Sequence, residues 1–431
     1  MSTAFLLCLL VLFLLAAMGA PIAHAILVGS FVYLFAAGQN IGIAGKTMMD
    51  GLYQSFILLA VPLFIVAANI MNAGTISDRL LNFCVALVGR FRGGLGHVNV
   101  VASLIFSGMS GSAIADAAGV GRILCEMMAK TGHYTRGYAA AITAASATIG
   151  PIIPPSIPMV LYALVSNTSI GYLFLGGIVP GLLMGAVLMG LNAWIARRRG
   201  FGREEAVPMR AMPGVTARAF PALLMPVILL YGIYGGVTTP TEAAAVAAFY
   251  ALILAGLFYR ALSLGALYEI LVSSARSSAA VGLVIGGALI LNYVVASENI
   301  PGRVASSLLG LDIHPLVFFL AVNVLILLLG CLLDATTLIL VIIPLFLPAS
   351  AALGIDPVHF GVVVIVNCMI GLITPPYGIL LFVVATITRI PLGEIIREIW
   401  PFLGVLVAAL LLLILFPGLT LWLPRLMGYP G

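Results

Sequence analysis

Charged residues are scarce in this sequence, since Asp, Glu, Lys and Arg make up only 8% of its 431 residues. Soluble domains carry about 25% charged residues, so this shortage excludes a water-soluble fold of such a size. The alternation of apolar and polar residues that is typical of outer-membrane barrels is also missing. The five cysteines and five histidines are scattered without the spacing of a metal site. No HExxH or GxSxG pattern is present, which argues against an intramembrane enzyme.

Apolar residues fill the sequence instead: 63% of the chain is hydrophobic and the mean hydropathy is +1.23. Runs of about 15–20 apolar residues recur from end to end, near the length that crosses roughly 30 Å of hydrocarbon. The first run, STAFLLCLLVLFLLAAMG, lacks a basic region before it and is followed at once by another apolar run. We expect a retained first helix there. The sequence predicts an all-α polytopic membrane protein.

Two halves of the chain resemble each other at an offset of about 215–224 residues. Their boundaries are predicted at 4–196 and 219–424, with a polar cytoplasmic linker at 197–218. Internal similarity of this kind indicates a repeat architecture. The repeated pieces are VNV at 98–100 and 322–324, and IGPIIPP at 149–155 with IGLITPP at 370–376.

Lysine and arginine predict the orientation of the halves. The linker carries six arginines and is therefore expected to be cytoplasmic. A topology with an odd number of crossings in each half places 15 of the 19 Lys and Arg on that side. The halves would then be inverted relative to each other, with both termini periplasmic. Inverted repeats are typical of secondary transporters.

One segment in each half is predicted to be a re-entrant helical hairpin. The first spans about 96–130, has basic residues at both ends and contains the small-residue run SGMSGSAIADAAGVG. Because both ends should be cytoplasmic, the segment must enter and leave on one side. The second hairpin, about 315–352, has its tip at GCLLDATT and would enter from the opposite face.

A broken helix is predicted after each hairpin, at about 137–165 and 358–388. The first contains ATIGPIIPPSIPM, in which prolines and a glycine prevent a continuous helix. Non-helical backbone at membrane depth is tolerated only where it is buried in protein or lines a wet cavity. Its free carbonyl oxygens suit a sodium ion, and half-helix N-termini suit an anionic substrate. We therefore expect the binding site where the hairpin tips meet the breaks.

The predicted site residues follow from that placement. The sodium-binding candidates are Ser107, Ser110, Gly111, Ser112, Thr148, Gly150, Pro151, Asp334, Thr336, Thr337, Gly371, Thr374 and Pro375. The substrate-binding candidates are Ser110, Ser156, Thr337 and Tyr377. No cofactor and no metal other than Na⁺ is expected.

Ionisable residues inside apolar segments are functional candidates by default. Asp116 and Asp334, at the two tips, are expected to bind sodium or to orient a ligand. Arg122 and Glu126 are four residues apart, which predicts an internal ion pair that lets the hairpin arm bury both. Glu242 follows a threonine by three residues at the start of an apolar run, a pattern that predicts a helix capping box.

Five stretches resemble a known family. They are GMSGSAIADAAGVG, ATIGPIIPPSIPMVLYA, GGVTTPTEAAAVAAFYALI, LLDATT and GLITPPYGILLFV. In this order they resemble the large membrane subunit of the TRAP transporters, the tripartite ATP-independent periplasmic transporters. The resemblance covers essentially the whole chain.

The resemblance implies sodium-driven import of organic acid anions, such as C4-dicarboxylates or sialic acid, across the bacterial inner membrane. It implies two protein partners: a soluble periplasmic substrate-binding protein and a separate small membrane subunit of four helices. It also implies an elevator mechanism, in which a transport block of about 92–168 and 313–388 slides against a scaffold, with sodium sites at the hairpin tips and breaks. The mixed-polarity segments 46–56 and 261–277 would be interfacial arms between block and scaffold.

Two other functions stay open at this point. A stand-alone dicarboxylate carrier, coupled to sodium or protons, would need no binding protein. A channel could also contain inverted broken helices. Neighbouring genes for a binding protein and a small subunit would distinguish the first alternative from a TRAP transporter. The net charge of +5 is explained by the cytoplasmic basic residues without any nucleic-acid partner.

Overall fold

The computed structural model describes residues 2–72, 75–203, 208–309 and 313–431. Within these ranges the chain forms helices joined by loops, with no β-strand, which confirms the predicted all-α class. Five of the described helices are long and apolar enough to cross a membrane. A sixth span results if the bent pair Gly42–Tyr53 and Phe56–Met71 is counted as one.

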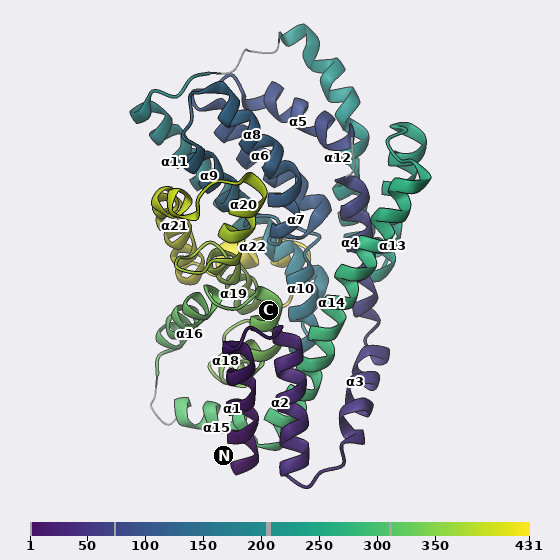
Figure 1. The fold of residues 1–431 in the computed structure, drawn as a ribbon, viewed down its shortest axis with the longest axis vertical. Helices are drawn as coiled ribbons and strands as arrows, with labels where there is room; N and C mark the ends of the chain where they lie inside the picture. Colours follow the sequence, from purple (N-terminus) through teal and green to yellow (C-terminus); the bar gives the residue numbers. More distant parts are fainter. Residues whose placement is uncertain (1, 73–74, 204–207, 310–312) are drawn as a thin grey trace.

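The helices that precede the hairpins include the longest one that the structure describes. Among them, α4, α13 and α14 pack together along one side of the molecule (Figure 1). Before the first hairpin lie α1 (Thr3–Ala17), α2 (Ile22–Ala36), α3 (Gly42–Gln54), the 3₁₀ helix η1 (Phe56–Leu59), α4 (Ala60–Met71) and α5 (Thr75–Val88). Before the second lie α12 (Met212–Tyr234), α13 (Pro240–Ile253), the π-helical η4 (Leu254–Phe258), α14 (Leu264–Ser297) and α15 (Ile300–Leu309).

Each half then contains a hairpin, a broken helix and a long helix, in this order. The first set is α6 (Gly94–Ser110), α7 (Ala113–Asp116), the π-helical η2 (Ala117–Gly121), α8 (Arg122–Thr131), α9 (Arg136–Ala147), α10 (Ile157–Ser166) and α11 (Ile170–Arg199). The second is α16 (Pro315–Gly330), α17 (Ala335–Thr337), the π-helical η5 (Leu338–Ile342), the 3₁₀ helix η6 (Ile343–Leu345), α18 (Leu347–Ala352), α19 (Pro357–Gly371), α20 (Ile379–Thr388) and α21 (Leu392–Leu415), followed by α22 (Gly418–Leu426).

The helices α9 and α19, which lead into the two breaks, form the centre of the core. Every residue from Gly137 to Ala147 in α9 and from Val358 to Gly371 in α19 is buried. The α9 segment consists largely of alanine, whose small side chain allows neighbouring helices to approach closely. The two breaks therefore begin at the most enclosed part of the molecule, opposite the side formed by α4, α13 and α14 (Figure 1).

The polar linker is shorter in the structure than the predicted 197–218. Helix α11 continues through the arginines to Arg199, and α12 already begins at Met212. Arginine is a good helix former, so the helix extends beyond its apolar part. A short 3₁₀ helix, η3 (Met209–Ala211), lies between them, and residues 204–207 lie outside the described residues.

The two predicted arms differ from each other. The first is a separate helix, α3, which ends where Ser55 leaves helical geometry, and the chain bends by 71° at this point. The second is not separate: residues 264–297 form one continuous 34-residue helix, α14. Its sequence has no proline between the polar and apolar parts, and its alanines favour uninterrupted helix.

Candidate functional site

The first hairpin turns at a glycine. Helix α6 ends at Ser110, and Gly111 adopts a left-handed conformation with φ of 59°. The Ser112 side chain then accepts a hydrogen bond from the Ala115 N–H and caps α7. After α7 the arm passes through the π-helical η2, and such segments occur frequently at functional sites.

The second hairpin turns in a related way but is capped by an acid. The Asp334 carboxylate accepts hydrogen bonds from the Thr337 N–H at 3.2 Å and from the Thr337 hydroxyl at 2.5 Å. Thr336 lies half-buried beside them. The arm then continues through the π-helical η5, just as the first arm continues through η2.

Asp116 is the most enclosed acidic group at either tip, with 4% of its surface exposed. One of its oxygens, Oδ1, accepts a hydrogen bond from the Ser110 hydroxyl. The other oxygen, Oδ2, is buried without a hydrogen-bond partner among the described residues. A buried carboxylate is unfavourable unless a cation or a proton neutralises it. Asp116 therefore has an open coordination position at the tip.

The first tip packs directly on the first break. A Cβ atom added to Gly150, in the break, would lie 2.4 Å from Asp116 Oδ2. A Cβ atom added to Gly111, at the tip, would lie 2.5 Å from the carbonyl oxygen of Pro155. Only glycine permits these approaches. As a result, a carboxylate, a hydroxyl and backbone carbonyls of the break come together at one place.

The second tip packs on the second break through two glycines. The Cα atom of Gly330, at the end of α16, faces Gly371, and a Cβ added to Gly371 would lie 2.8 Å from it. Each break also contains one cis peptide bond, Pro154–Pro155 in the first and Pro375–Pro376 in the second. The tip-to-break contact is thus present in both halves.

The two sites also share elements. The second arm of the first hairpin, from α7 to α8, packs against α20, which follows the second break. In the same way α17 and η5 of the second hairpin pack against α10, which follows the first break. Each tip therefore contacts half-helices from both halves of the chain.

Buried amide networks tie each hairpin to the helix before its break. Asn99 on α6 donates to the Thr143 hydroxyl on α9 at 2.7 Å and accepts from Ser146 at 2.9 Å. Asn367 on α19 donates to the backbone oxygen of Asn323 on α16 at 2.6 Å. Both Asn99 and Asn323 belong to the sequence repeat, and neither is among the predicted site residues. An amide side chain inside an apolar run is the feature of the sequence that marks them.

Several predicted ligands make only local hydrogen bonds. The hydroxyls of Ser107, Thr148 and Thr374 donate to carbonyls three or four residues earlier in the chain. Ser156 caps α10 by accepting from the Met159 N–H, and its hydroxyl donates to the Pro151 carbonyl. Pro375 is half-buried and Tyr377 is 58% exposed.

The ionisable residues outside the tips behave differently from one another. Arg122 and Glu126 do form an ion pair at 3.0 Å, but their side chains are 58% and 53% exposed. The prediction of a buried pair is wrong, because this face of α8 points away from the protein. Glu242 and Thr239 form the predicted capping box. Among the described residues, no group of three His, Cys, Asp or Glu could hold a metal ion.

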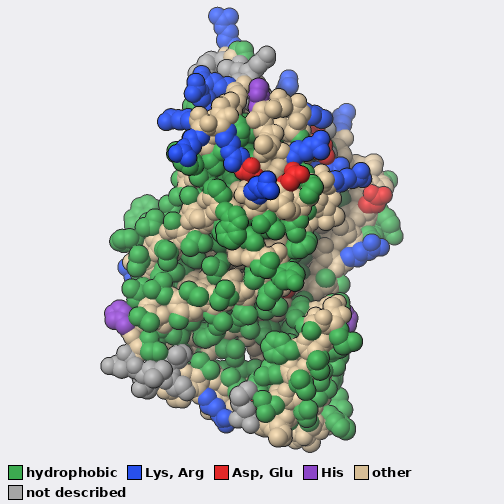
Figure 2. Space-filling model, turned by 60° about the vertical axis from the view of Figure 1, so that its left-hand side comes forward, with side chains coloured by type: hydrophobic (Ala, Val, Ile, Leu, Met, Phe, Trp, Pro, Cys, Tyr) green, Lys and Arg blue, Asp and Glu red, His purple; other side chains and the backbone are tan. Residues whose placement is uncertain are grey.

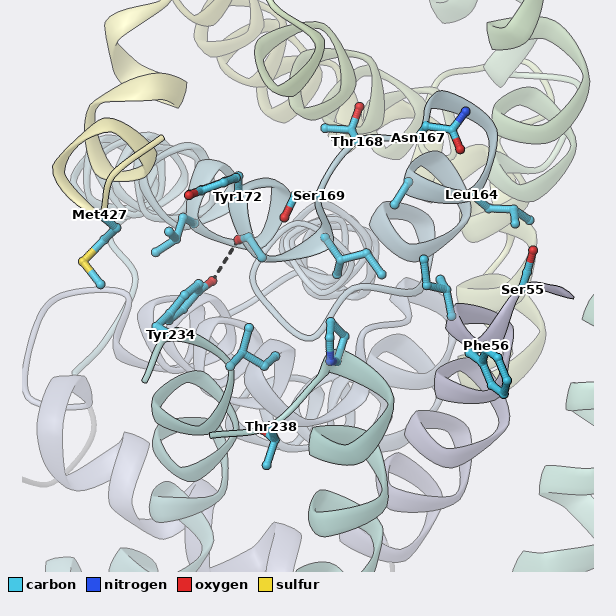
Figure 3. A pocket seen from close by; sticks show the side chains of 17 residues that line it. Ser55, Phe56, Leu164, Asn167, Thr168, Ser169, Tyr172, Tyr234, Thr238 and Met427 are labelled. Carbon is cyan, nitrogen blue, oxygen red and sulfur yellow. Dashed lines mark hydrogen bonds between the residues drawn. The ribbon is translucent and has the colours of Figure 1, made fainter. Parts of the chain in front are cut away.

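A cavity of about 860 Å³ lies away from the two tips (Figure 3). Its wall combines η1 and the α12–α13 connection with the end of α10 and the start of α11. One hydrogen bond, from the Tyr234 hydroxyl to the Gly171 carbonyl at 3.3 Å, joins the two sides. None of the predicted site residues lines this cavity.

Comparison with known proteins identifies similar chains. The family model described as "Tripartite ATP-independent periplasmic transporter, DctM component" matches residues 9–419. The sialic acid TRAP transporter large permease protein of Vibrio cholerae is 42% identical over 413 residues, covering 95% of this chain and 96% of the relative. The C4-dicarboxylate TRAP transporter large permease protein of Pseudomonas aeruginosa is 39% identical, covering 87% and 88%.

Two further similarities concern substrate variety and fold. The 2,3-diketo-L-gulonate TRAP transporter large permease protein of Escherichia coli is 37% identical over 406 residues, covering 94% of this chain and 95% of the relative. The crystal structure of the YdaH transporter of Alcanivorax borkumensis aligns with a TM-score of 0.62 at 16% identity, covering 86% of this chain and 87% of that one. At that identity the likeness concerns the fold alone.

Proposed function

The chain belongs to the family of DctM components of tripartite ATP-independent periplasmic transporters, and we propose that it imports organic acid anions by a sodium-driven elevator mechanism. Family membership agrees with the resemblance noted in the sequence. It also agrees with the expectation that the chain is a membrane transport protein and not an enzyme.

The open carboxylate of Asp116 is the observation that carries the sodium proposal. Its Oδ2 atom is buried without a partner, and it faces the break at Gly150. Sodium is a hard cation that prefers oxygen ligands, and carboxylate, hydroxyl and carbonyl oxygens meet at this tip. The residues present thus fit a sodium ion bound by Asp116, Ser110 and carbonyls of the break. A second ion would use the oxygens of Asp334, Thr337 and the second break.

Organic acid anions are the substrate class that best fits the breaks. Sialic acid, C4-dicarboxylates and 2,3-diketo-L-gulonate are named for three relatives, and all are organic acids. The N-termini of α10 and α20 emerge from the breaks, and the positive end of a helix dipole favours a carboxylate. Ser110, Ser156, Thr337 and Tyr377 are the proposed substrate contacts.

The proposed elevator needs a block that slides against a scaffold. The crossed packing of the hairpins on α10 and α20 would make the two sites one rigid block. The cavity in Figure 3 lies where the end of α10, in the block, faces η1 and the α12–α13 connection, in the scaffold. An incompletely packed stretch of this boundary supports sliding, because fewer contacts must be exchanged there.

Two protein partners complete the proposal. A tripartite family favours a periplasmic substrate-binding protein and a small four-helix membrane subunit over a stand-alone carrier. Genes for both beside the gene of this chain would support it. We place the chain in the bacterial inner membrane with both termini periplasmic.

Thermal unfolding of the full-length chain in sodium chloride and in potassium chloride tests the sodium site. A ligand at a hundredfold excess over its Kd stabilises the folded state by about 2.7 kcal/mol. We expect a saturable, sodium-specific rise in the unfolding midpoint that is lost in Ser110→Ala. Equal midpoints in the two salts would contradict sodium coupling and favour protons or a channel.

A reversible cross-link tests the elevator. A Cβ added to Gly119, in the first hairpin of the block, would lie 3.7 Å from Asn72 Cγ, at the end of α4 in the scaffold. Gly119→Cys with Asn72→Cys therefore places two thiols within reach of a disulfide. Native Cys331, which is half-exposed, is replaced by serine in the same background. Oxidation should stop uptake of radiolabelled sialic acid or C4-dicarboxylate in proteoliposomes with the partner subunits, and reduction should restore it. Undiminished uptake by the fully cross-linked protein would refute sliding at this boundary.

A further inference from the structure

Basic side chains gather at the end of the molecule where α5, α11 and the linker lie, above a broad apolar belt (Figure 2). At this end a cavity of about 920 Å³ opens between the α5–α6 loop and the end of α11. Its basic lining residues are Arg90, Arg92, His97, Arg197 and Arg203. The apolar lining residues are Phe91, Met189 and Ala193. We call this cavity the arginine pocket.

Hydrogen bonds hold the two sides of the arginine pocket together. The Gly93 N–H donates to the Gly202 carbonyl at 2.9 Å, and the Asn192 side chain donates to the Gly93 carbonyl at 3.1 Å. The Tyr138 hydroxyl donates to the Asn192 amide oxygen at 2.7 Å, and this bond fixes the orientation of the amide. A Cβ added to Gly96 would lie 2.1 Å from that same oxygen. The loops that carry the arginines are therefore positioned by the fold.

His97 contributes a buried ring to the pocket. Its side chain is only 5% exposed, and its Nδ1 atom has no hydrogen-bond partner among the described residues. The residue lies in the first turn of α6, which begins at Gly94 between the pocket residues Arg92 and His97. The positive end of this 17-residue helix therefore points to the same place, and it favours an anion there.

The four arginines lack acidic partners in the part of the chain that the structure describes. Its two ion pairs within 4.0 Å involve Arg122 and Arg199, and neither of these lines the pocket. In the sequence Glu204 and Glu205 follow Arg203, and they lie outside the described residues. Four exposed guanidinium groups around one cavity create a positive potential that attracts anions, and planar guanidinium groups match phosphate in particular.

We propose that the arginine pocket binds a phosphate group. An anionic phospholipid headgroup or a soluble phosphate ester could carry it. The apolar wall favours the lipid, because Met189 and Ala193 lie on the apolar helix α11, along which an acyl chain would continue from the headgroup. Basic pockets between membrane helices on the cytoplasmic side are known to bind such headgroups. The proposal is independent of the sodium sites and of the elevator.

A lipid titration of the full-length chain, read by native mass spectrometry, tests the pocket. The probes are phosphatidylglycerol, phosphatidylcholine and inorganic phosphate. The pocket variant is Arg90→Gln with Arg197→Gln, and both arginines are exposed, so folding should be unaffected. The matched control, Arg136→Gln with Arg210→Gln, changes the net charge equally and alters exposed arginines that do not line the pocket.

We expect wild type to prefer phosphatidylglycerol over phosphatidylcholine. The pocket variant should bind it about 30-fold more weakly, and the control less than about threefold. If inorganic phosphate binds with the same dependence and phosphatidylglycerol does not, the phosphate site stands and its source is soluble. Equal losses in both double variants would overturn the proposal. A wild type that neither prefers phosphatidylglycerol over phosphatidylcholine nor binds inorganic phosphate would also overturn it. Binding that emerges only in Glu204→Gln with Glu205→Gln would also overturn it, because those carboxylates would then be the native occupants.

Discussion

At the first hairpin tip the acidic residue stands at the end of the short helix α7, whereas at the second it stands before the short helix α17. Asp116 and Thr337 are the residues that directly precede the two π-helical segments. Both tips thus contain one hydrogen bond between a hydroxyl and a carboxylate, with the acid in a different position. Asp334 uses both oxygens on Thr337, while Asp116 keeps one oxygen unpartnered.

The two aspartates therefore have different roles at their tips. A carboxylate whose oxygens both accept hydrogen bonds at a helix N-terminus stabilises local structure. A buried carboxylate with a free oxygen requires a cation or a proton from outside. The two halves therefore share the same order of hairpin, break and long helix. The first tip differs because it holds a buried carboxylate oxygen without a hydrogen-bond partner among the described residues.

Neutralising the aspartate at each tip should give the largest difference between the two tips in sodium binding. Asp116→Asn should weaken sodium binding roughly tenfold or more, because the free anionic oxygen is lost. Asp334→Asn should weaken it less, by about threefold, because asparagine still caps the helix and keeps one side-chain oxygen for the second ion. The sodium concentration at half-maximal rise of the unfolding midpoint measures both. A larger effect at Asp334 would reverse the comparison.

Adding one methyl group to each break should separate stability from ion binding. Gly371→Ala forces a Cβ onto the Gly330 backbone and should lower the free energy of unfolding by about 1–3 kcal/mol. Gly150→Ala forces it onto the Asp116 carboxylate and should reduce the sodium-specific rise as well. Gly393→Ala is the control, because no atom lies within 4 Å of its added Cβ. Chemical denaturation with and without sodium distinguishes the three variants. Identical sodium responses of Gly150→Ala and Gly371→Ala would mean that Asp116 does not bind sodium.

Removing the amide networks should have a similar effect in the two halves. Asn99→Ala and Asn367→Ala should each reduce the free energy of unfolding by about 0.6–1.7 kcal/mol, the range for hydrogen bonds between membrane helices. A double-mutant cycle of Asn99→Ala with Ser146→Ala isolates the bond between α6 and α9. Additive effects in the cycle would show that this bond does not couple the two helices.

The exposed ion pair of the first hairpin should matter least. Arg122→Gln should change the free energy of unfolding by less than about 0.5 kcal/mol, as for other exposed pairs four residues apart on a helix. Glu126→Gln serves as the matched partner in the same melting experiment. A loss several times larger would indicate that a partner covers this face of α8.

The positions of the breaks and of the first tip could be predicted from the sequence, because they depend on residue types with strong local effects on the backbone. Prolines and glycines located the breaks near 151 and 375, and the small residues around Gly111 located the first tip. Polar and apolar runs indicated the all-helical membrane class. The capping box at Glu242 was also predictable, since it depends only on residues three apart.

Features that depend on tertiary packing were not predictable in the same way. Which face of α8 points outward decides whether Arg122 is buried, and composition does not contain that information. The hydroxyl of Thr148 looked like a free ligand in the sequence, but in the structure it bonds its own helix. The free oxygen of Asp116 became visible only when the residues packed around it were known.

Helix α14 has a mechanical consequence. Its 34 residues measure about 51 Å at 1.5 Å per residue, well beyond the roughly 30 Å of hydrocarbon in a bilayer. Near its C-terminal end the Asn292 side chain bonds the Leu340 carbonyl in the second hairpin at 3.2 Å. The helix is continuous, and it also packs against α2, α3 and α4. The Asn292 bond therefore attaches the second hairpin to a stiff rod that is longer than the hydrocarbon layer is thick.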